Sequence, residues 1–107
     1  MRDTRKQIAF DLDTKALKKY YPSKSWHGAY EVIKRHMTAN GFYWLQGSVY
    51  VSERPMRPFH VTRIVNDLVN KNMWLNACMR DCRETNVGTN YDINKLFDRE
   101  VNLQPRS

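Results

Sequence analysis

The sequence has few cysteines and no long hydrophobic run. Its two cysteines, Cys78 and Cys82, are four residues apart, and no CxxC pair or nearby histidine completes a zinc or redox site. We therefore expect free thiols in a reducing compartment. No apolar stretch approaches the roughly 20 residues of a membrane span, and the apolar part of the N-terminus is too short for a secretory signal. These absences predict a cytoplasmic protein without a membrane partner.

Several catalytic signatures are also missing. The sequence contains no glycine-rich phosphate loop, no nucleophile elbow and no helix-turn-helix pattern that would indicate a DNA-binding module. The histidines share no metal-like spacing: we expect His27 and His36 on solvated helix flanks and His60 at the start of a helix. Residue spacing by itself therefore does not identify a reaction.

Basic residues clearly exceed acidic ones. The 107 residues include 18 Lys and Arg against 11 Asp and Glu, which gives a formal net charge of +7. Such a surplus favours polyanionic partners, of which nucleic acid is the commonest in a cytosol, although many small domains are basic for solubility alone. The basic residues form short, dispersed groups, which indicates a folded basic face and not a disordered tail.

Hydrophobic periodicity along the chain predicts an α+β fold. A strand over residues 7–13 alternates apolar positions, and helical spacing appears at about 14–21, 26–40 and 58–72. Between the helices, aromatic and β-branched residues flank Gln46-Gly47 and predict a tight hairpin, and residues 78–85 resemble a charged edge strand. The order is β-α-β-β-α-β, the ferredoxin-like pattern, which predicts an antiparallel sheet with helices on one face and the first and third strands as central neighbours.

The chain length suits one domain. We expect a ferredoxin-like core over about residues 7–86 and a C-terminal extension over 87–107. In that extension, Ile93, Leu96, Phe97 and Val101 have the spacing of a further amphipathic helix.

The predicted hairpin strands are apolar at nearly every position. A half-exposed strand would alternate apolar and polar residues, so we expect Phe42–Leu45 and Val49–Val51 to be covered on both faces. Helices would cover one face. A homodimer joined through its sheet faces would cover the other and would close symmetrically.

Asp11 is the residue whose position most needs an explanation. It alternates with Phe10 and Leu12, so its carboxylate points to the uncovered face of the sheet. A helix cap or an arginine partner is the commoner role for such a residue, and a catalytic or metal-binding carboxylate is the other. In a two-fold dimer, two copies of Asp11 would be able to share a divalent cation. Ser48 and Asp81 have ordinary explanations as a turn serine and a salt-bridged strand residue.

Three segments of the chain resemble the VapD family, virulence-associated protein D. These are IAFDLD near the start, GFYWLQGSVYV in the middle and MRDCRE late in the chain, and the resemblance covers about residues 7–86. VapD proteins are small bacterial proteins, often encoded on plasmids or in toxin–antitoxin pairs, that form dimers and are described as endoribonucleases cutting mRNA. The family has a ferredoxin-like fold related to the small CRISPR-associated nuclease of spacer acquisition. This chain differs in the six residues before its first strand and in its tail beyond Val87.

The resemblance implies an endoribonuclease that cleaves single-stranded RNA or mRNA as a homodimer, with an antitoxin as a further partner. It implies catalytic roles for the motif residues Asp11, Ser48 and Asp81. RNA cleavage needs a group that activates the attacking oxygen and positive charge that offsets the developing phosphorane charge. Asp11 is the candidate for the first task, directly or through Mg²⁺. The candidates for the second task, and for RNA binding, are Arg80, Arg83, Arg54 and Lys15.

Two alternatives stay open on the sequence. Tyr43 and Tyr50 are able to stack on unpaired bases if they are exposed, although core or dimer packing explains them better. The protein as a whole is alternatively a non-catalytic dimeric adaptor that binds nucleic acid or an antitoxin through the same basic surface, since a fold alone does not determine a function.

Overall fold

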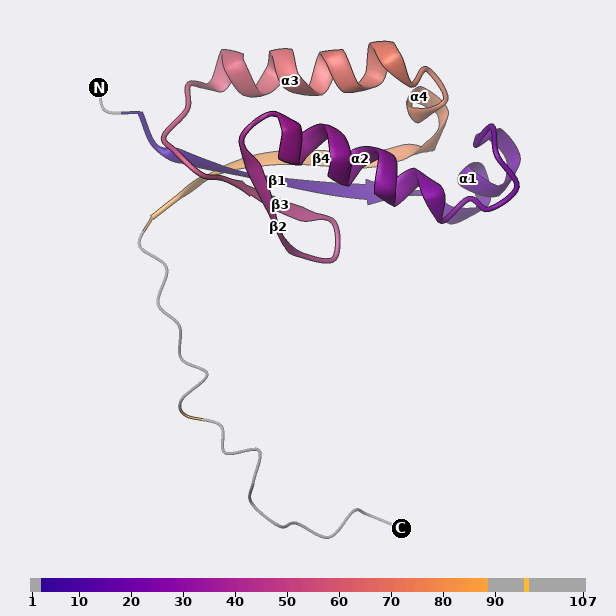
Figure 1. Cartoon of the computed structure of the whole chain (residues 1–107), viewed down its shortest axis with the longest axis horizontal. Coiled ribbons are helices and arrows are strands. Elements are labelled where there is room, and N and C mark those ends of the chain that lie inside the picture. Colours follow the sequence, from indigo (N-terminus) through magenta and orange to yellow (C-terminus); the bar gives the residue numbers. More distant parts are fainter. Residues whose placement is uncertain (1–2, 89–95, 97–107) are drawn as a thin grey trace, which may run out of the picture.

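A computed structural model of the chain describes residues 3–88 and Leu96 (Figure 1). The elements in order are β1 (Arg5–Leu12), α1 (Thr14–Tyr20), α2 (Gly28–Ala39), β2 (Phe42–Gln46), β3 (Val49–Ser52), α3 (Pro58–Lys71), α4 (Leu75–Cys78) and β4 (Met79–Val87). The strands form one sheet in the order β2-β3-β1-β4, with every neighbouring pair antiparallel. The α+β class and the central pairing of the first and third strands are confirmed. The first helical connection holds the two predicted helices α1 and α2, and the second adds the short helix α4, which the sequence pattern did not predict, after α3.

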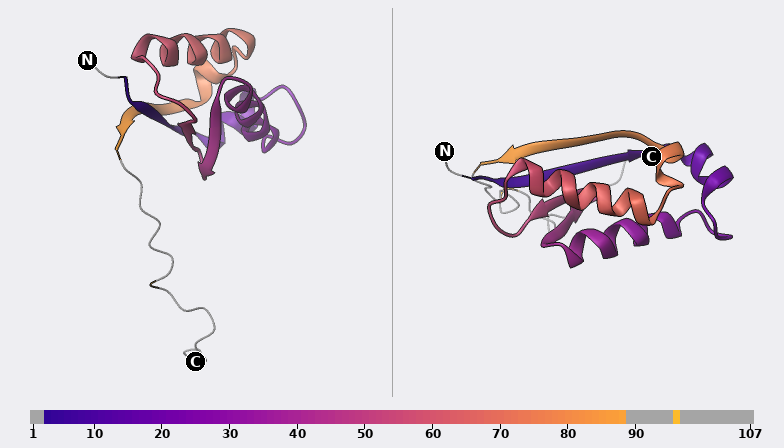
Figure 2. Two further views of the ribbon diagram at one scale, coloured as in Figure 1. Left: turned by 60° about the vertical axis from the view of Figure 1, so that its left-hand side comes forward. Right: turned by 90° about the horizontal axis from the view of Figure 1, so that it is seen from above.

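Helices α2 and α3 lie across one face of the sheet, and none of the described helices lies on the other face (Figures 1 and 2). The alternation along β1 produces this arrangement, because Ile8, Phe10 and Leu12 are all buried against the helices. Helix α2 contributes Ile33 and Met37 to the same core. Full burial of each such side chain is worth about 1.5–3 kcal/mol, so this apolar layer is the main force that holds the helices to the sheet.

Helix α1 begins and ends where its sequence signals predict. The Asp13 carboxylate accepts hydrogen bonds from the backbone N–H groups of Lys15 and Ala16, at 2.9 and 3.3 Å, and so caps the helix. The helix ends at Tyr20, two residues before Pro22. Its one fully buried side chain is Leu17. The next helix, α2, begins at Gly28 and receives no side-chain cap.

Helices α2 and α3 are joined by a histidine that we expected to be solvated. The Nε2 atom of His36 donates a hydrogen bond to the backbone carbonyl of Ile64 at 2.8 Å, and the side chain is half-buried. A carbonyl oxygen only accepts, so Nε2 carries the proton in this contact. The expectation for His36 was therefore wrong, since the packing of two helices decides its environment.

The turn of the hairpin is displaced by one residue from its predicted position. Gln46 pairs with Val49, so the turn residues are Gly47 and Ser48, and Gly47 has the positive φ of +50° that such turns require. Leu45 has no pairing partner between Trp44 and Gln46, which makes it the extra residue of a β-bulge.

The two strands of the hairpin differ in how deeply their side chains are buried. Tyr50 and Val51 of β3 are buried, whereas Trp44 and Leu45 of β2 are 49% and 41% exposed. Because Tyr50 packs edge-on against Phe10 in the core, it is not available to stack on a base. Tyr43 is half-buried, and its hydroxyl accepts a hydrogen bond from Arg5. Core packing, the better of our two explanations, is correct for Tyr50.

The predicted C-terminal helix and nearly all of the predicted extension lie outside the described residues, so both stay predictions. Among the helices that the structure describes, none combines the length and the apolar character needed to cross a lipid bilayer.

The buried thiol of Cys78 gives a testable pH dependence. Burial, together with the nearby charge of Asp13, raises the pKa of this thiol above its ordinary value of 9.0. Above about pH 9 the unfolded chain releases the proton more readily than the folded one, so folding stability is intact below this pH and falls above it. The loss is up to about 1.4 kcal/mol per pH unit. We expect Cys78→Ala to remove this part of the alkaline loss in urea unfolding under reducing conditions. Parallel pH profiles for wild type and variant would contradict the assignment.

Candidate active site on the open face of the sheet

Two aspartates face each other across the central and edge strands. In the antiparallel pairing of β1 with β4, Asp11 lies directly opposite Asp81. Both are exposed, and both point away from the helices, because their neighbours Phe10 and Cys82 form the adjacent pair on the helix side. Directly opposite side chains have Cβ atoms about 4.5–5.5 Å apart, so the two carboxylates share one small area of the open face.

A β-bulge lies immediately beside this pair. Asp11 pairs with Asp81, but Leu12 pairs with Met79, so Arg80 is an extra residue without a partner in the ladder. Such bulges redirect side chains next to active sites. Here the Nη2 atom of Arg80 lies 4.0 Å from Oδ1 of Asp13, the residue that caps α1. The bulge therefore connects the edge strand to the start of α1.

The three aspartates of this region differ in their partners. Asp81 Oδ2 accepts a hydrogen bond from Arg83 Nε at 2.8 Å, and this contact raises the pKa of Arg83. Asp13 is occupied by the helix cap and by Arg80. Within the described part of the chain, the Asp11 carboxylate has neither a hydrogen-bond nor an ion-pair partner. Of the three, it is the one available to take up a proton or a cation.

Ser48 reaches the same end of the sheet from the hairpin turn. Its backbone carbonyl accepts a hydrogen bond from the N–H of Phe10 at 3.0 Å, which fixes it one residue from Asp11 along β1. It flanks β1 on the side opposite β4. The residues of the three sequence motifs, far apart in the chain, therefore lie on neighbouring segments of one sheet end.

The predicted basic residues divide into two groups. Lys15 in α1 is exposed and follows Asp11 by four residues, and Arg80 and Arg83 flank Asp81. Arg54 lies elsewhere: its carbonyl accepts a hydrogen bond from the Ser52 hydroxyl, which in turn bonds to Lys6 near the start of β1. Since five residues of strand cover about 16 Å, Arg54 is far from Asp11. The antiparallel hairpin is the reason, because it brings its turn to Asp11 and its far end to Lys6.

One cavity lies on the other face of the sheet. It has a volume of about 200 Å³ between α3 and β4 and is lined by Ile8, Val61, Thr62, Val65, Asn66, Cys82 and Glu84. None of the candidate catalytic residues lines it. Partial desolvation of this exposed cysteine, together with the charge of Asp81, raises the pKa of the Cys82 thiol, so it is protonated and a poor nucleophile at neutral pH.

Comparison with known proteins adds the family. No family model matches the chain. It is 33% identical over 86 residues to "Endoribonuclease VapD 2" of Riemerella anatipestifer, covering 80% of this chain and 92% of that protein. It is 40% identical over 80 residues to "Endoribonuclease VapD" of Dichelobacter nodosus, covering 75% and 83%, and 31% identical over 90 residues to "Endoribonuclease VapD" of Helicobacter pylori, covering 83% and 94%. The chain belongs to the VapD family. The resemblance carried by the three sequence motifs is thereby confirmed.

Membership of the VapD family does not by itself assign functional roles to residues, so candidate roles are taken from the geometry of the site. The opposition of Asp11 and Asp81 is the feature that sequence reasoning missed, although both lie at open-face positions of their strands. The period of two in each strand was the available signal. What the sequence lacks is the register between the strands, which only their pairing fixes.

The carboxylate pair predicts a measurable cost in stability. Like charges directly opposite on a sheet destabilise it, and the exposure of this pair keeps the effect small. We expect Asp11→Asn to raise the free energy of unfolding by about 0.2–1 kcal/mol at low salt, and less at high salt because of screening. Urea unfolding at low and at high salt measures both free energies. Asp81→Asn is the control: we expect a smaller increase in the free energy of unfolding, since this variant also loses the contact with Arg83. A loss of stability on Asp11→Asn would mean instead that Asp11 has a structural partner.

Proposed function

We propose that this VapD-family protein is an endoribonuclease that cleaves single-stranded RNA, mRNA included, as a homodimer. Its relatives in Riemerella, Dichelobacter and Helicobacter are named endoribonucleases. The observation that carries the proposal is the Asp11 carboxylate, which lies opposite Asp81 without a partner of its own in the described residues. Arg83 is bonded to Asp81, and Arg80 lies 4.0 Å from Asp13. An exposed, unpaired carboxylate beside fixed positive charge is what phosphodiester cleavage requires.

In the proposed mechanism, Asp11 accepts the proton of the attacking oxygen. A new P–O bond forms as the bond from phosphorus to the leaving ribose oxygen breaks, and the leaving oxygen takes a proton from solvent. Arg83 is held by its bond to Asp81, and the guanidinium groups of Arg83 and Arg80 offset the charge that develops on the phosphorane oxygens. Lys15 adds a third positive charge from α1. The Ser48 hydroxyl is the candidate for a hydrogen bond to the phosphate or to a water.

Mg²⁺ is a candidate cofactor for this site. The residues described in one chain contain no cluster of three or more His, Cys, Asp or Glu side chains able to hold a metal ion. Asp11 and Asp81 supply two carboxylates, which suits Mg²⁺, because this ion keeps several waters and binds few protein ligands alongside phosphate oxygens. When bound, the ion would lower the pKa of a coordinated water and neutralise phosphate charge.

The homodimer is proposed from the open face of the sheet. Ala9 and Val49 are half-buried apolar residues that pair with each other at open-face positions, and no helix in the described residues covers this side (Figure 2). A two-fold contact between two such faces would cover these residues and bring the two copies of Asp11 towards each other. An antitoxin stays a predicted partner.

Cleavage of a labelled single-stranded RNA tests the function. We expect purified wild-type protein to cleave it and Asp11→Asn, prepared identically, to lose at least about a hundredfold in rate, the usual contribution of a positioned base. The Asp11→Asn protein should be as stable as wild type or more so, which excludes unfolding as the cause. Parallel reactions with magnesium and with a chelator test the metal.

The other outcomes of this assay are equally informative. Equal cleavage by wild type and Asp11→Asn would assign the activity to a contaminant or to another residue. Binding of RNA without cleavage by either protein would favour the non-catalytic adaptor.

The oligomeric state is tested by sedimentation or light scattering. We expect wild-type protein to have the mass of a dimer and Val49→Glu to have that of a monomer, because the substitution buries a charge in the proposed contact. The matched control is Asn70→Glu, which adds the same charge at an exposed position of α3 and should remain dimeric. A monomeric wild type would refute the dimer and leave the endoribonuclease proposal standing.

A further inference from the structure

Helix α1 and the loop after it form a strongly basic surface. Residues 14–24 include Lys15, Lys18, Lys19 and Lys24 but no Asp or Glu, and all four lysines are exposed. The first three follow one another at i, i+3 and i+4, which sets them on one side of the helix. Leu17 lies on the opposite side and is fully buried. The helix therefore turns one apolar side to the protein and one cationic side to solvent.

Two lysines of this surface lie beside aromatic rings. No carboxylate of the described residues lies within 4.0 Å of their ammonium groups. The Nζ atom of Lys19 is instead 5.2 Å from the centroid of the Tyr20 ring, and that of Lys18 is 5.7 Å from the Trp26 ring. Tyr20 is 48% exposed. Unpaired positive charge beside an exposed aromatic ring is the combination that binds single-stranded nucleic acid, through phosphates and stacked bases.

This surface is held firmly against the fold. The N–H of Asp13, just before α1, donates to the Cys78 carbonyl at the end of α4 at 2.8 Å. At the other end of α1, the Tyr21 and Trp74 rings meet edge-on with centroids 4.8 Å apart. A surface fixed at both ends binds without a large ordering cost.

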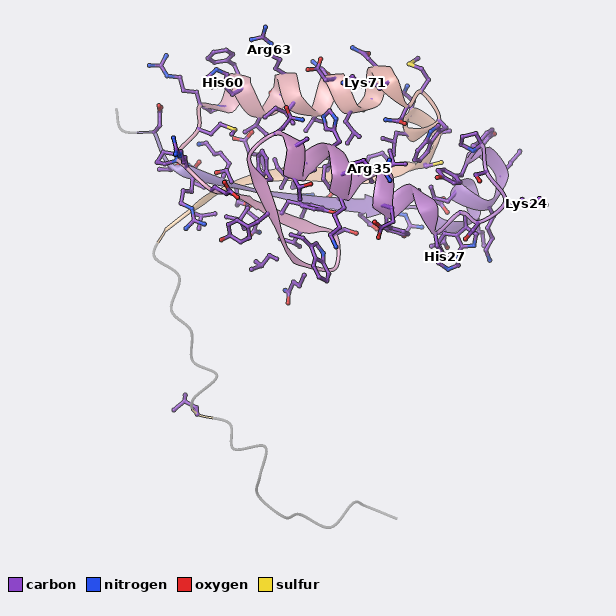
Figure 3. The ribbon with its side chains drawn as sticks, viewed as in Figure 1. Lys24, His27, Arg35, His60, Arg63 and Lys71 are labelled. Atoms are coloured by element: carbon purple, nitrogen blue, oxygen red, sulfur yellow. The ribbon has the colours of Figure 1, made fainter. Side chains whose placement is uncertain are left out.

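The surface is also continuous with the candidate active site. Helix α1 lies beyond the end of β1, and Asp11 precedes the capping residue Asp13 by two positions (Figure 1). Arg80, the neighbour of Asp81, reaches back to Asp13. Figure 3 shows Lys24 and His27 at this end of the molecule, whereas Arg35, Arg63 and Lys71 lie on α2 and α3.

We propose that the α1 surface, made of Lys15, Lys18, Lys19, Tyr20 and Lys24, binds the backbone of single-stranded RNA and stacks an unpaired base on Tyr20. It thereby leads the strand to Asp11 and Asp81. The proposal deepens the proposed function and rests on it for the identity of the substrate. The basic residues on α2 and α3 contribute only general charge.

Binding of labelled oligouridylate, followed by fluorescence anisotropy in the Asp11→Asn protein, tests the surface without cleavage. The test variant combines Lys18→Gln, Lys19→Gln and Lys24→Gln, and the matched control combines Arg35→Gln, Arg63→Gln and Lys71→Gln. Both remove three exposed positive charges. We expect the test variant to lose about tenfold or more in affinity and the slope of log K against log salt to fall by about 2, at roughly 0.7 per phosphate contact. The control should lose less than about threefold.

Two further variants separate contact from folding. The replacement of the same three lysines by arginine should keep the affinity, since it keeps the charge. Tyr20→Ala should lower the affinity for the oligonucleotide by about fivefold or more. Tyr20→Phe should leave the affinity unchanged, because stacking needs the ring and not the hydroxyl. Equal losses in the test and control triple variants, or unchanged binding in the test variant, would overturn the proposal.

The failure of this proposal is distinguishable from that of the proposed function. In the active protein, the test variant should raise KM for RNA cleavage. Cleavage with unchanged binding and KM would overturn the α1 surface and leave the endoribonuclease standing. Binding that depends on the α1 surface in a wild-type protein that does not cleave RNA would support the surface and refute the endoribonuclease.

Discussion

The pairing of β1 with β4 is the contact on which both the fold and the site depend. It runs from Arg5 opposite Val87 to Leu12 opposite Met79 and joins the first and last strands of the described chain. Because side chains alternate with a period of two, a slip of one residue would turn the core residues of one strand to the other face. The register that buries Phe10 therefore also sets Asp11 opposite Asp81. Core and candidate site are fixed together.

This arrangement includes features that a sheet built only for stability would avoid. Two carboxylates lie directly opposite each other, an extra residue interrupts the ladder beside them, and β4 is exposed along nearly all its length. Arg83 offsets part of the repulsion at Asp81, and Arg80 lies near Asp13, so Asp11 is the one of these three carboxylates that no described residue compensates. Local violations of this kind concentrate at functional sites, because the rest of the fold can stabilise them.

The molecule separates its tasks in space. The helix side of the sheet holds the apolar core, the open face carries the carboxylates, and α1 at the end of β1 carries a basic, aromatic surface. The short connection from Asp11 through the capping Asp13 to Lys15 joins the carboxylates of the open face to the basic surface of α1. An RNA strand bound along α1 would thus approach the carboxylates without any rearrangement of the core.

The sequence by itself determined the local features: the faces of β1, the cap at Asp13, the chain order of strands and main helices, and the family. These follow from periodicity and from residues close together in the chain. The tertiary structure alone decided that Asp11 opposes Asp81, that Ser48 lies beside β1, that Arg54 is distant and that His36 joins two helices. The reason is physical. Strand register and helix packing arise from contacts between residues far apart in the chain, and no local pattern encodes which residues will meet.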